Sequence, residues 1–149
     1  MRKIFFLTLA VFATAFFSQS VKAQTEAQRI ELCTKVAGGD ATFLSSYPVQ
    51  LKAATAGERA PNFKQATALK KGNRYRFTIC TDEESDGEAI LELFDEAKKA
   101  GSSYNAETGK TYQNFDFDCA KTAVYIIFIS FKDGKEGSAV GILSHVKTL

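Results

Sequence analysis

The 149-residue sequence has very few of the residues from which metal and redox sites are built. It contains one histidine and three cysteines, which leaves few ligands for a zinc or haem site. No C-x-x-C pair occurs, so a thioredoxin-type redox site is excluded. The phosphate-binding patterns G-x-x-x-x-G-K-[ST] and G-x-G-x-x-G are missing, as is the G-x-S-x-G of many hydrolases. These absences exclude the common phosphate-binding and thiol-redox motifs.

A large excess of charge of either sign is also missing. The formal net charge is +2, whereas a dedicated nucleic-acid-binding protein usually carries a strong basic excess. We therefore expect no nucleic-acid partner. The chain is 45% apolar and 24% charged, which is an ordinary composition for one globular domain.

The first 23 residues have the pattern of a secretory signal peptide. A basic start at residues 2–3 precedes an apolar run over residues 4–17, which is short for a hydrocarbon core of about 30 Å. Val21 and Ala23 suit the −3 and −1 positions of signal peptidase, so we expect cleavage between Ala23 and Gln24. An uncleaved N-terminal anchor is the alternative. No later run reaches membrane-spanning length, so we expect a secreted or periplasmic protein with no membrane span in the mature chain.

The charge of the exported chain is segregated along the sequence. Removing the first 23 residues takes away three of the 19 basic residues and none of the 17 acidic ones, which leaves a net charge of −1. Residues 82–96 hold eight acidic side chains and no basic one. Such a stretch repels itself unless solvent, a cation or a basic partner relieves the repulsion.

Export also predicts a disulfide bond, because exported proteins meet an oxidising compartment. Cys33, Cys80 and Cys119 allow three pairings, and their spacing alone does not choose among them. We predict a bond between Cys80 and Cys119, since both lie at strand ends where two backbones can approach to about 5.5 Å. Cys33 is then the odd thiol.

One helix followed by strands is expected. Thr25 caps a helical pattern that runs to Val36, and a second short helical turn is expected over residues 43–47 before Pro48. The expected strands cover residues 63–69, 75–79, 89–94, 102–104, 115–119, 124–131 and 139–146. In the second of these, Tyr75, Phe77 and Ile79 alternate with less apolar residues, which predicts a half-buried strand.

Short strands separated by turn signals predict an all-β fold, an antiparallel jelly-roll-like β-sandwich. We expect a helical segment over residues 24–48 and the sandwich over residues 49–149. The strand at 124–131 is apolar on both faces, which predicts a central strand covered on both sides. Asp133-Gly134-Lys135 is a hairpin turn signal before the last strand.

Several of these strands resemble a known family. The segments LKKGNRYRF (69–77), LELFD (91–95), FDF (115–117) and VYII (124–127) are similar to bacterial pre-peptidase C-terminal-like domains, and to small exported bacterial β-sandwich proteins of unknown function. The resemblance covers roughly residues 63–146. It implies a jelly-roll-like sandwich with a non-catalytic accessory or binding role.

The acidic stretch is the best candidate for a metal site. Asp82, Glu84, Asp86 and Gly87 match the first half of an EF-hand calcium loop. The twelfth position is Leu93 instead of Glu and no helix flanks the loop, so an EF-hand is rejected. A simpler calcium site remains one interpretation, and a solvated acidic turn is the other. No other cofactor is expected.

Candidates for catalysis are few. His145 is the only histidine, and Asp116 and Asp118 lie on one face of a strand at a separation that a glycosidase could use. Alternate positions of any strand meet that separation, so solvated charge on a sheet face is the favoured explanation of the two carboxylates. Tyr104, Tyr112 and Phe115 lie in or beside a polar loop with two asparagines, and they could form a carbohydrate or peptide platform or could close one end of the sandwich.

Taken together, these patterns favour an exported, non-catalytic binding or structural module of the bacterial envelope. Its expected partner is a protein or a glycan. A small carboxylate-based hydrolase is the alternative function.

Overall fold

The computed structural model describes residues 24–149, so the predicted signal peptide lies outside the described residues. The elements are α1 (Glu26–Ala37), β1 (Thr42–Leu51), β2 (Phe63–Leu69), β3 (Asn73–Thr81), β4 (Ala89–Asp95), β5 (Lys98–Ser102), β6 (Tyr104–Asn105), β7 (Lys110–Thr111), β8 (Asn114–Asp118), β9 (Ala123–Phe131), a 3-10 turn (Lys132–Gly134) and β10 (Gly137–Thr148). Within residues 24–149, none of the helical structure is long and apolar enough to span a bilayer.

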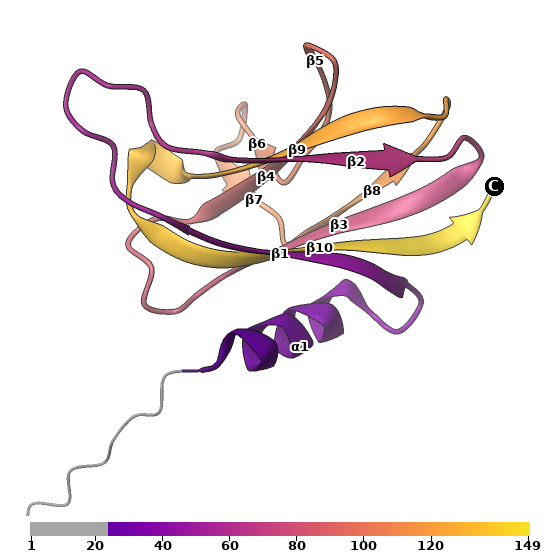
Figure 1. Ribbon diagram of the computed structural model, residues 1–149, viewed down its shortest axis with the longest axis horizontal. Coiled ribbons are helices and arrows are strands. Elements are labelled where there is room, and N and C mark those ends of the chain that lie inside the picture. The colour runs from indigo at the N-terminus through magenta and orange to yellow at the C-terminus, as the bar shows by residue number, and fades with distance from the viewer. Residues whose placement is uncertain (1–23) are drawn as a thin grey trace, which may run out of the picture.

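Eight of the strands form two four-stranded sheets that pack face to face (Figure 1). Sheet A has the order β1-β10-β3-β8, and sheet B has the order β2-β9-β4-β5. Neighbouring strands are antiparallel in both sheets, and β6 and β7 form a small separate ribbon. The structure therefore confirms the predicted antiparallel β-sandwich preceded by a short helix.

The chain changes sheet at most of its connections. One consequence is that the hairpin expected at Asp133-Gly134-Lys135 is wrong. β9 pairs with β2 and β4 in sheet B, whereas β10 pairs with β1 and β3 in sheet A. A turn signal marks where the chain reverses, but it does not determine which strand becomes the hydrogen-bonded neighbour.

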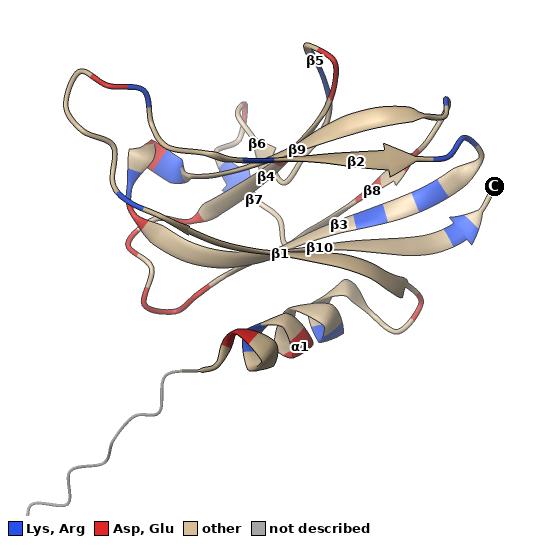
Figure 2. Cartoon of the chain, in the orientation of Figure 1, with Lys and Arg blue, Asp and Glu red and all other residues tan. Residues whose placement is uncertain are grey.

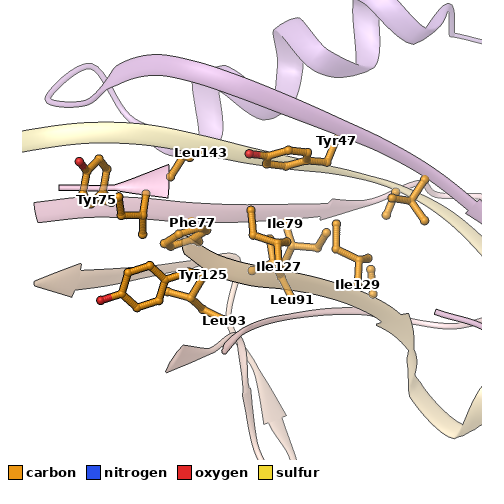
Figure 3. Close-up of a cluster of buried hydrophobic side chains, with 14 of the residues drawn as sticks. Tyr47, Tyr75, Phe77, Ile79, Leu91, Leu93, Tyr125, Ile127, Ile129 and Leu143 are labelled. Atoms are coloured by element: carbon orange, nitrogen blue, oxygen red, sulfur yellow. The ribbon is translucent and has the colours of Figure 1, made fainter. Parts of the chain in front are cut away.

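Inward-facing side chains of the two sheets fill the sandwich core (Figure 3). Phe77 comes from sheet A, while Leu91, Leu93, Ile127 and Ile129 come from sheet B, and each is at most 1% exposed. Burial of one such side chain stabilises the fold by about 1.5–3 kcal/mol. Along β4 and β9 the buried side chains recur at every second position, as the pleat of a strand requires.

β9 lies in the interior of sheet B, as predicted, but only one of its faces is covered within residues 24–149. Ile127 faces the core, whereas Val124 on the outer face is 60% exposed and Phe128 is half-buried. The expectation that both faces of this strand are covered is therefore wrong for the described chain. The reason is that α1, the one α-helix of this range, packs on the opposite sheet (Figure 1).

α1 has a well-defined start and end. The hydroxyl of Thr25 accepts a hydrogen bond from the backbone N–H of Gln28 (3.3 Å), and the side chain of Gln28 accepts one from the N–H of Thr25 (2.9 Å). This capping box satisfies two backbone donors at the N-terminus. Gly38 ends the helix with a φ of 93°, a backbone conformation that favours glycine.

The second helical turn expected over residues 43–47 is wrong, because these residues belong to β1. The side chains of Tyr47 and Val49 face the core, and the strand pairs with β10 along its length. Pro48 is tolerated within the strand because β1 lies at the edge of sheet A. The sandwich therefore begins near Thr42 and not at residue 49.

Candidate functional site

Three kinds of contact fasten α1 to the outer face of sheet A. Cys33 of α1 forms a disulfide with Cys80 of β3, with the two Cα atoms 5.8 Å apart. Cys33 and Ala37 also pack against Val140 of β10 in a small apolar cluster. At the C-terminal end of the helix, the guanidinium of Arg76 donates a hydrogen bond to the carbonyl oxygen of Ala37 (2.9 Å). The middle and the C-terminal end of α1 are consequently held against β3 and β10.

The predicted pairing of Cys80 with Cys119 is wrong. The backbone N–H of Cys119 donates to the carbonyl of Asn73 (3.0 Å), so Cys119 lies beside the first residue of β3. Cys80 lies seven residues further along that strand, which corresponds to about 23 Å. Cys119 is a free, buried thiol, and Cys33 on the packed face of the helix is the true partner.

The acidic loop, which we define as residues 82–88, is fastened to the start of β10. The hydroxyl of Ser85 donates to the carbonyl of Ser138 (2.8 Å) and accepts from the N–H of Ser138 (2.8 Å). The N–H of Gly87 donates to the carbonyl of Glu136 (3.0 Å). These bonds fix the backbone of the loop while most of its carboxylates face solvent.

Asp82 differs from the other carboxylates of the loop because it is paired. Its carboxylate forms an ion pair with the guanidinium of Arg29 in α1, and both side chains are about one-fifth exposed (23% and 19%). Glu83, Glu84 and Asp86 form no ion pair within residues 24–149. Arg29 therefore ties α1 to the acidic loop without neutralising the remaining charge.

These elements enclose a groove of about 710 Å³, which we call the acidic groove. It is lined by Gln24, Arg29, Gln50, Leu51, Asp82, Glu83, Glu84, Ser85, Asp86, Glu136, Gly137 and Ser138. Five of these residues are acidic and one is basic. Figure 2 shows the acidic loop in red at the end of the sandwich nearest the first turn of α1. The groove is a concave surface with a strong excess of negative charge.

The residues expected to bind calcium do not form a metal site in the described structure. Within residues 24–149, no three histidine, cysteine, aspartate or glutamate side chains gather in a way that could hold a metal ion. Asp82 is engaged by Arg29, whereas Glu84 and Asp86 are exposed on a loop whose backbone is bound to β10. The structure therefore does not bring Asp82, Glu84 and Asp86 together as the sequence pattern predicts.

The two carboxylates of the hydrolase alternative are also paired. The guanidinium of Arg74 donates to Asp118 (2.6 and 2.7 Å), and that of Arg76 donates to Asp116 (2.7 and 3.0 Å). The hydrogen bonds from Arg74 hold the pKa of Asp118 below its usual value. A general acid needs a raised pKa, so this pairing acts against acid catalysis by Asp118.

His145 lies on β10 at the opposite end of the sheet from the acidic groove. Its Nε2 atom is 3.0 Å from the amide oxygen of Asn73, and its ring packs edge-on against Tyr75, with the centroids 5.9 Å apart. An amide and an aromatic ring are structural partners and do not form a catalytic triad.

The three aromatic residues considered for a glycan platform differ in their surroundings. The ring of Tyr104 is covered by the ammonium of Lys132 (5.6 Å), whereas Tyr112 is 51% exposed. Phe115, which lies beside them in the sequence, stacks on Phe77 of the core with the ring centroids 5.2 Å apart. At least one of the three rings therefore serves to close the sandwich.

No family model and no curated protein sequence matches this chain. The fold is similar to that of Aeromonas hydrophila PliG, a periplasmic lysozyme inhibitor of g-type lysozyme, with a TM-score of 0.51 and 10% sequence identity. The match covers 70% of this chain and 87% of that protein. At this identity the likeness concerns the fold alone. The resemblance to pre-peptidase C-terminal-like domains is not supported by a family match, and the chain shares its β-rich fold with a periplasmic inhibitor protein.

Proposed function

We propose that this chain is an exported, non-catalytic module that binds a protein, and that the acidic groove receives a basic patch of that partner. The observation that carries the proposal is the composition of the groove. Among residues 24–149, five carboxylates and one cation line it, and that cation, Arg29, is already paired with Asp82. A concave acidic surface with low-dielectric walls attracts and orients a basic partner.

Two further features support this function. The disulfide between Cys33 and Cys80 is typical of proteins in an oxidising, exported compartment. The fold is shared with a periplasmic protein whose own partner is a g-type lysozyme. A protein therefore fits as the partner better than a glycan, since one of the three candidate aromatic rings, Phe115, stacks on Phe77 of the core.

The hydrolase alternative has no comparable support. Its two carboxylates, Asp116 and Asp118, are bound by Arg76 and Arg74 on a strand face, and His145 contacts Asn73 and Tyr75. We therefore expect His145→Ala to leave partner binding unchanged.

The test immobilises three forms of the chain from Gln24 to Leu149 on separate columns, passes envelope extract over each, and compares the proteins that each column retains. The first is wild type and the second is the groove variant Glu83→Gln/Glu84→Gln/Asp86→Asn, which retains Asp82 and hence the bond to Arg29. The third is a matched control, Glu31→Gln/Glu96→Gln/Glu107→Gln, which removes three exposed carboxylates elsewhere. We expect a protein that wild type and the control retain but the groove variant loses.

Purified g-type lysozyme serves as a defined probe in the same comparison. If it is the partner, the groove variant should bind it at least about tenfold more weakly than the control does, with a reduced salt dependence, because surface charge governs the encounter. Equal retention of every captured protein by the groove variant and the control would refute the proposed role of the groove.

A further inference from the structure

The four edge strands of the sandwich differ in how well they are protected against pairing with another chain. A free edge presents unpaired N–H and C=O groups, and proteins usually block it with proline, charge, a bulge or a short strand. In sheet A, β1 contains Pro48 and a bulge between Phe43 and Ser45. The other edge of that sheet, β8, is five residues long and carries Asp116 and Asp118.

In sheet B one edge is protected in the same way and the other is not. β5 is five residues long, carries Lys98 and Lys99, and has a register shift where it pairs with β4. β2 has seven residues, no proline and one charge, Lys64, and it pairs with β9 without any register shift. β2 is therefore the unprotected edge among the four.

The free side of β2 offers backbone groups at alternate residues. The side-chain amide of Gln65 donates to the carbonyl of Ala66 (3.1 Å), which indicates that this carbonyl points away from β9. In an antiparallel strand the N–H and C=O of one residue point to the same side. Lys64, Ala66 and Ala68 thus present their backbone groups outward, and their side chains are exposed on the outer face of sheet B.

We propose that β2 pairs antiparallel with β2 of a second copy of this chain about a twofold axis at Ala66, which joins the two copies of sheet B into one continuous sheet. In this register Ala66 lies opposite Ala66, and Lys64 lies opposite Ala68 of the second copy. On the inner face, Phe63 lies opposite Leu69. On pairing, the carbonyl of Ala66 exchanges its hydrogen bond from the side-chain amide of Gln65 for one from a backbone N–H of the second copy.

The charge pattern of β2 suits pairing with itself. No two charges lie directly opposite one another in this register, and the two Lys64 residues are offset by four positions along the strand, or about 13 Å. That distance exceeds the Debye length of about 8 Å at physiological salt, so their repulsion is weak. Two small alanines on the outer face also allow the backbones to approach closely.

The surroundings of β2 add apolar surface to the same side of the sandwich. Tyr47 of β1 and Phe63 of β2 are in aromatic contact with centroids 6.3 Å apart, which places the two edge strands side by side. Phe43 and Leu44 of β1 are 44% and 46% exposed. None of the residues that line the acidic groove belongs to β2, so the dimer leaves that site open.

The expected dimer is weak. Contact between two seven-residue edges buries less than the ~800 Å² per partner of a standard interface. We therefore expect a dissociation constant between about 10 μM and 1 mM. Sedimentation equilibrium of the chain from Gln24 to Leu149 should show the mass rising from monomer towards dimer over this range.

Charge substitutions at the proposed axis provide a specific test. Ala66→Lys and Ala66→Glu each place like charges opposite one another, so each variant alone should be monomeric. Mixed in equal amounts, they should form a heterodimer at least as tight as the wild-type dimer. Ala120→Lys, which changes an exposed alanine outside β2, should dimerise like wild type.

Far-UV circular dichroism establishes that each variant is folded before sedimentation. A wild-type chain that stays monomeric at about 1 mM would overturn the proposal, given the expected affinity. So would a dimer that both Ala66 variants retain, or a mixture of the two variants that remains monomeric.

Discussion

Removal of the disulfide between Cys33 and Cys80 should destabilise the protein strongly, because this bond closes a long loop. The two residues are 47 positions apart. In the chain-entropy model, closure of such a loop lowers the free energy of the native state relative to the unfolded state by about 4 kcal/mol. We expect Cys33→Ala/Cys80→Ala to lower the free energy of unfolding by about 2–5 kcal/mol, measured by urea denaturation of the chain from Gln24 to Leu149.

The same substitution should affect α1 more than the sandwich. The helix is also held by the contact of Ala37 with Val140 and by the ion pair of Arg29 with Asp82. Without the disulfide, hydrogen exchange should therefore increase over residues 26–37 before it increases in β9 or β10.

The control for this prediction is Cys119→Ala, which removes the free buried thiol. Denatured wild-type protein should contain one reactive thiol, and denatured Cys119→Ala should contain none. A variant with two reactive thiols would instead indicate that Cys119 belongs to the disulfide. A loss of less than about 1 kcal/mol in Cys33→Ala/Cys80→Ala would refute the argument from loop closure.

Three further predictions concern the pH dependence of stability and the packing of sheet B. Hydrogen bonds from Arg74 lower the pKa of Asp118, so this pairing stabilises the fold above the ordinary carboxyl pKa of about 4 and is lost as the pH falls through the lower folded-state pKa. Urea denaturation between pH 7 and pH 2 should consequently show a smaller acid-induced loss of stability in Asp118→Asn than in wild type. Burial and a hydrogen bond with Cys119 raise the pKa of Tyr125 to about 12, so stability should fall as the pH rises from about 10 towards 12. In an absorbance titration Tyr125 should ionise above the ordinary tyrosine pKa, and Tyr125→Phe should abolish this high-pH ionisation. A titration curve that the substitution leaves unchanged would contradict the raised pKa of Tyr125. Finally, Ile127→Ala should lower the free energy of unfolding by about 2–5 kcal/mol because the side chain is fully buried, whereas Val124→Ala on the outer face of the same strand should cost less than about 1 kcal/mol. Similar losses for both variants would indicate that the outer face of β9 is covered.

Much of the local structure was predictable because it depends on residues that are close in the sequence. The capping box of Thr25 and Gln28 marks the start of α1, and the alternation of Tyr75, Phe77 and Ile79 marks β3 and its core-facing side. The predicted strand over residues 63–69 coincides with β2. Side-chain periodicity and capping are local properties, so one sequence is sufficient to recognise them.

The acidic groove was only partly predictable. The carboxylates of residues 82–88 are evident in the sequence. The same groove is also lined by Glu136, which directly precedes β10, and by Arg29 of α1. The bonds that fix the loop join Ser85 to Ser138, which are 53 positions apart. A local match to the first half of a calcium loop gives no information on these contacts, because the loop's bonding partners are distant in the sequence.

The sequence by itself determined the order of most elements and the side of β3 that faces the core. Tertiary structure decided which sheet each strand joins, which cysteine pairs with Cys80, and which face of β9 remains uncovered. The physical reason is that backbone hydrogen bonds form equally well with any suitable neighbouring strand. Which strand becomes the neighbour is set by the simultaneous packing of both sheets and the helix. The same packing brings Cys33 close to Cys80 and keeps Cys119 away from it.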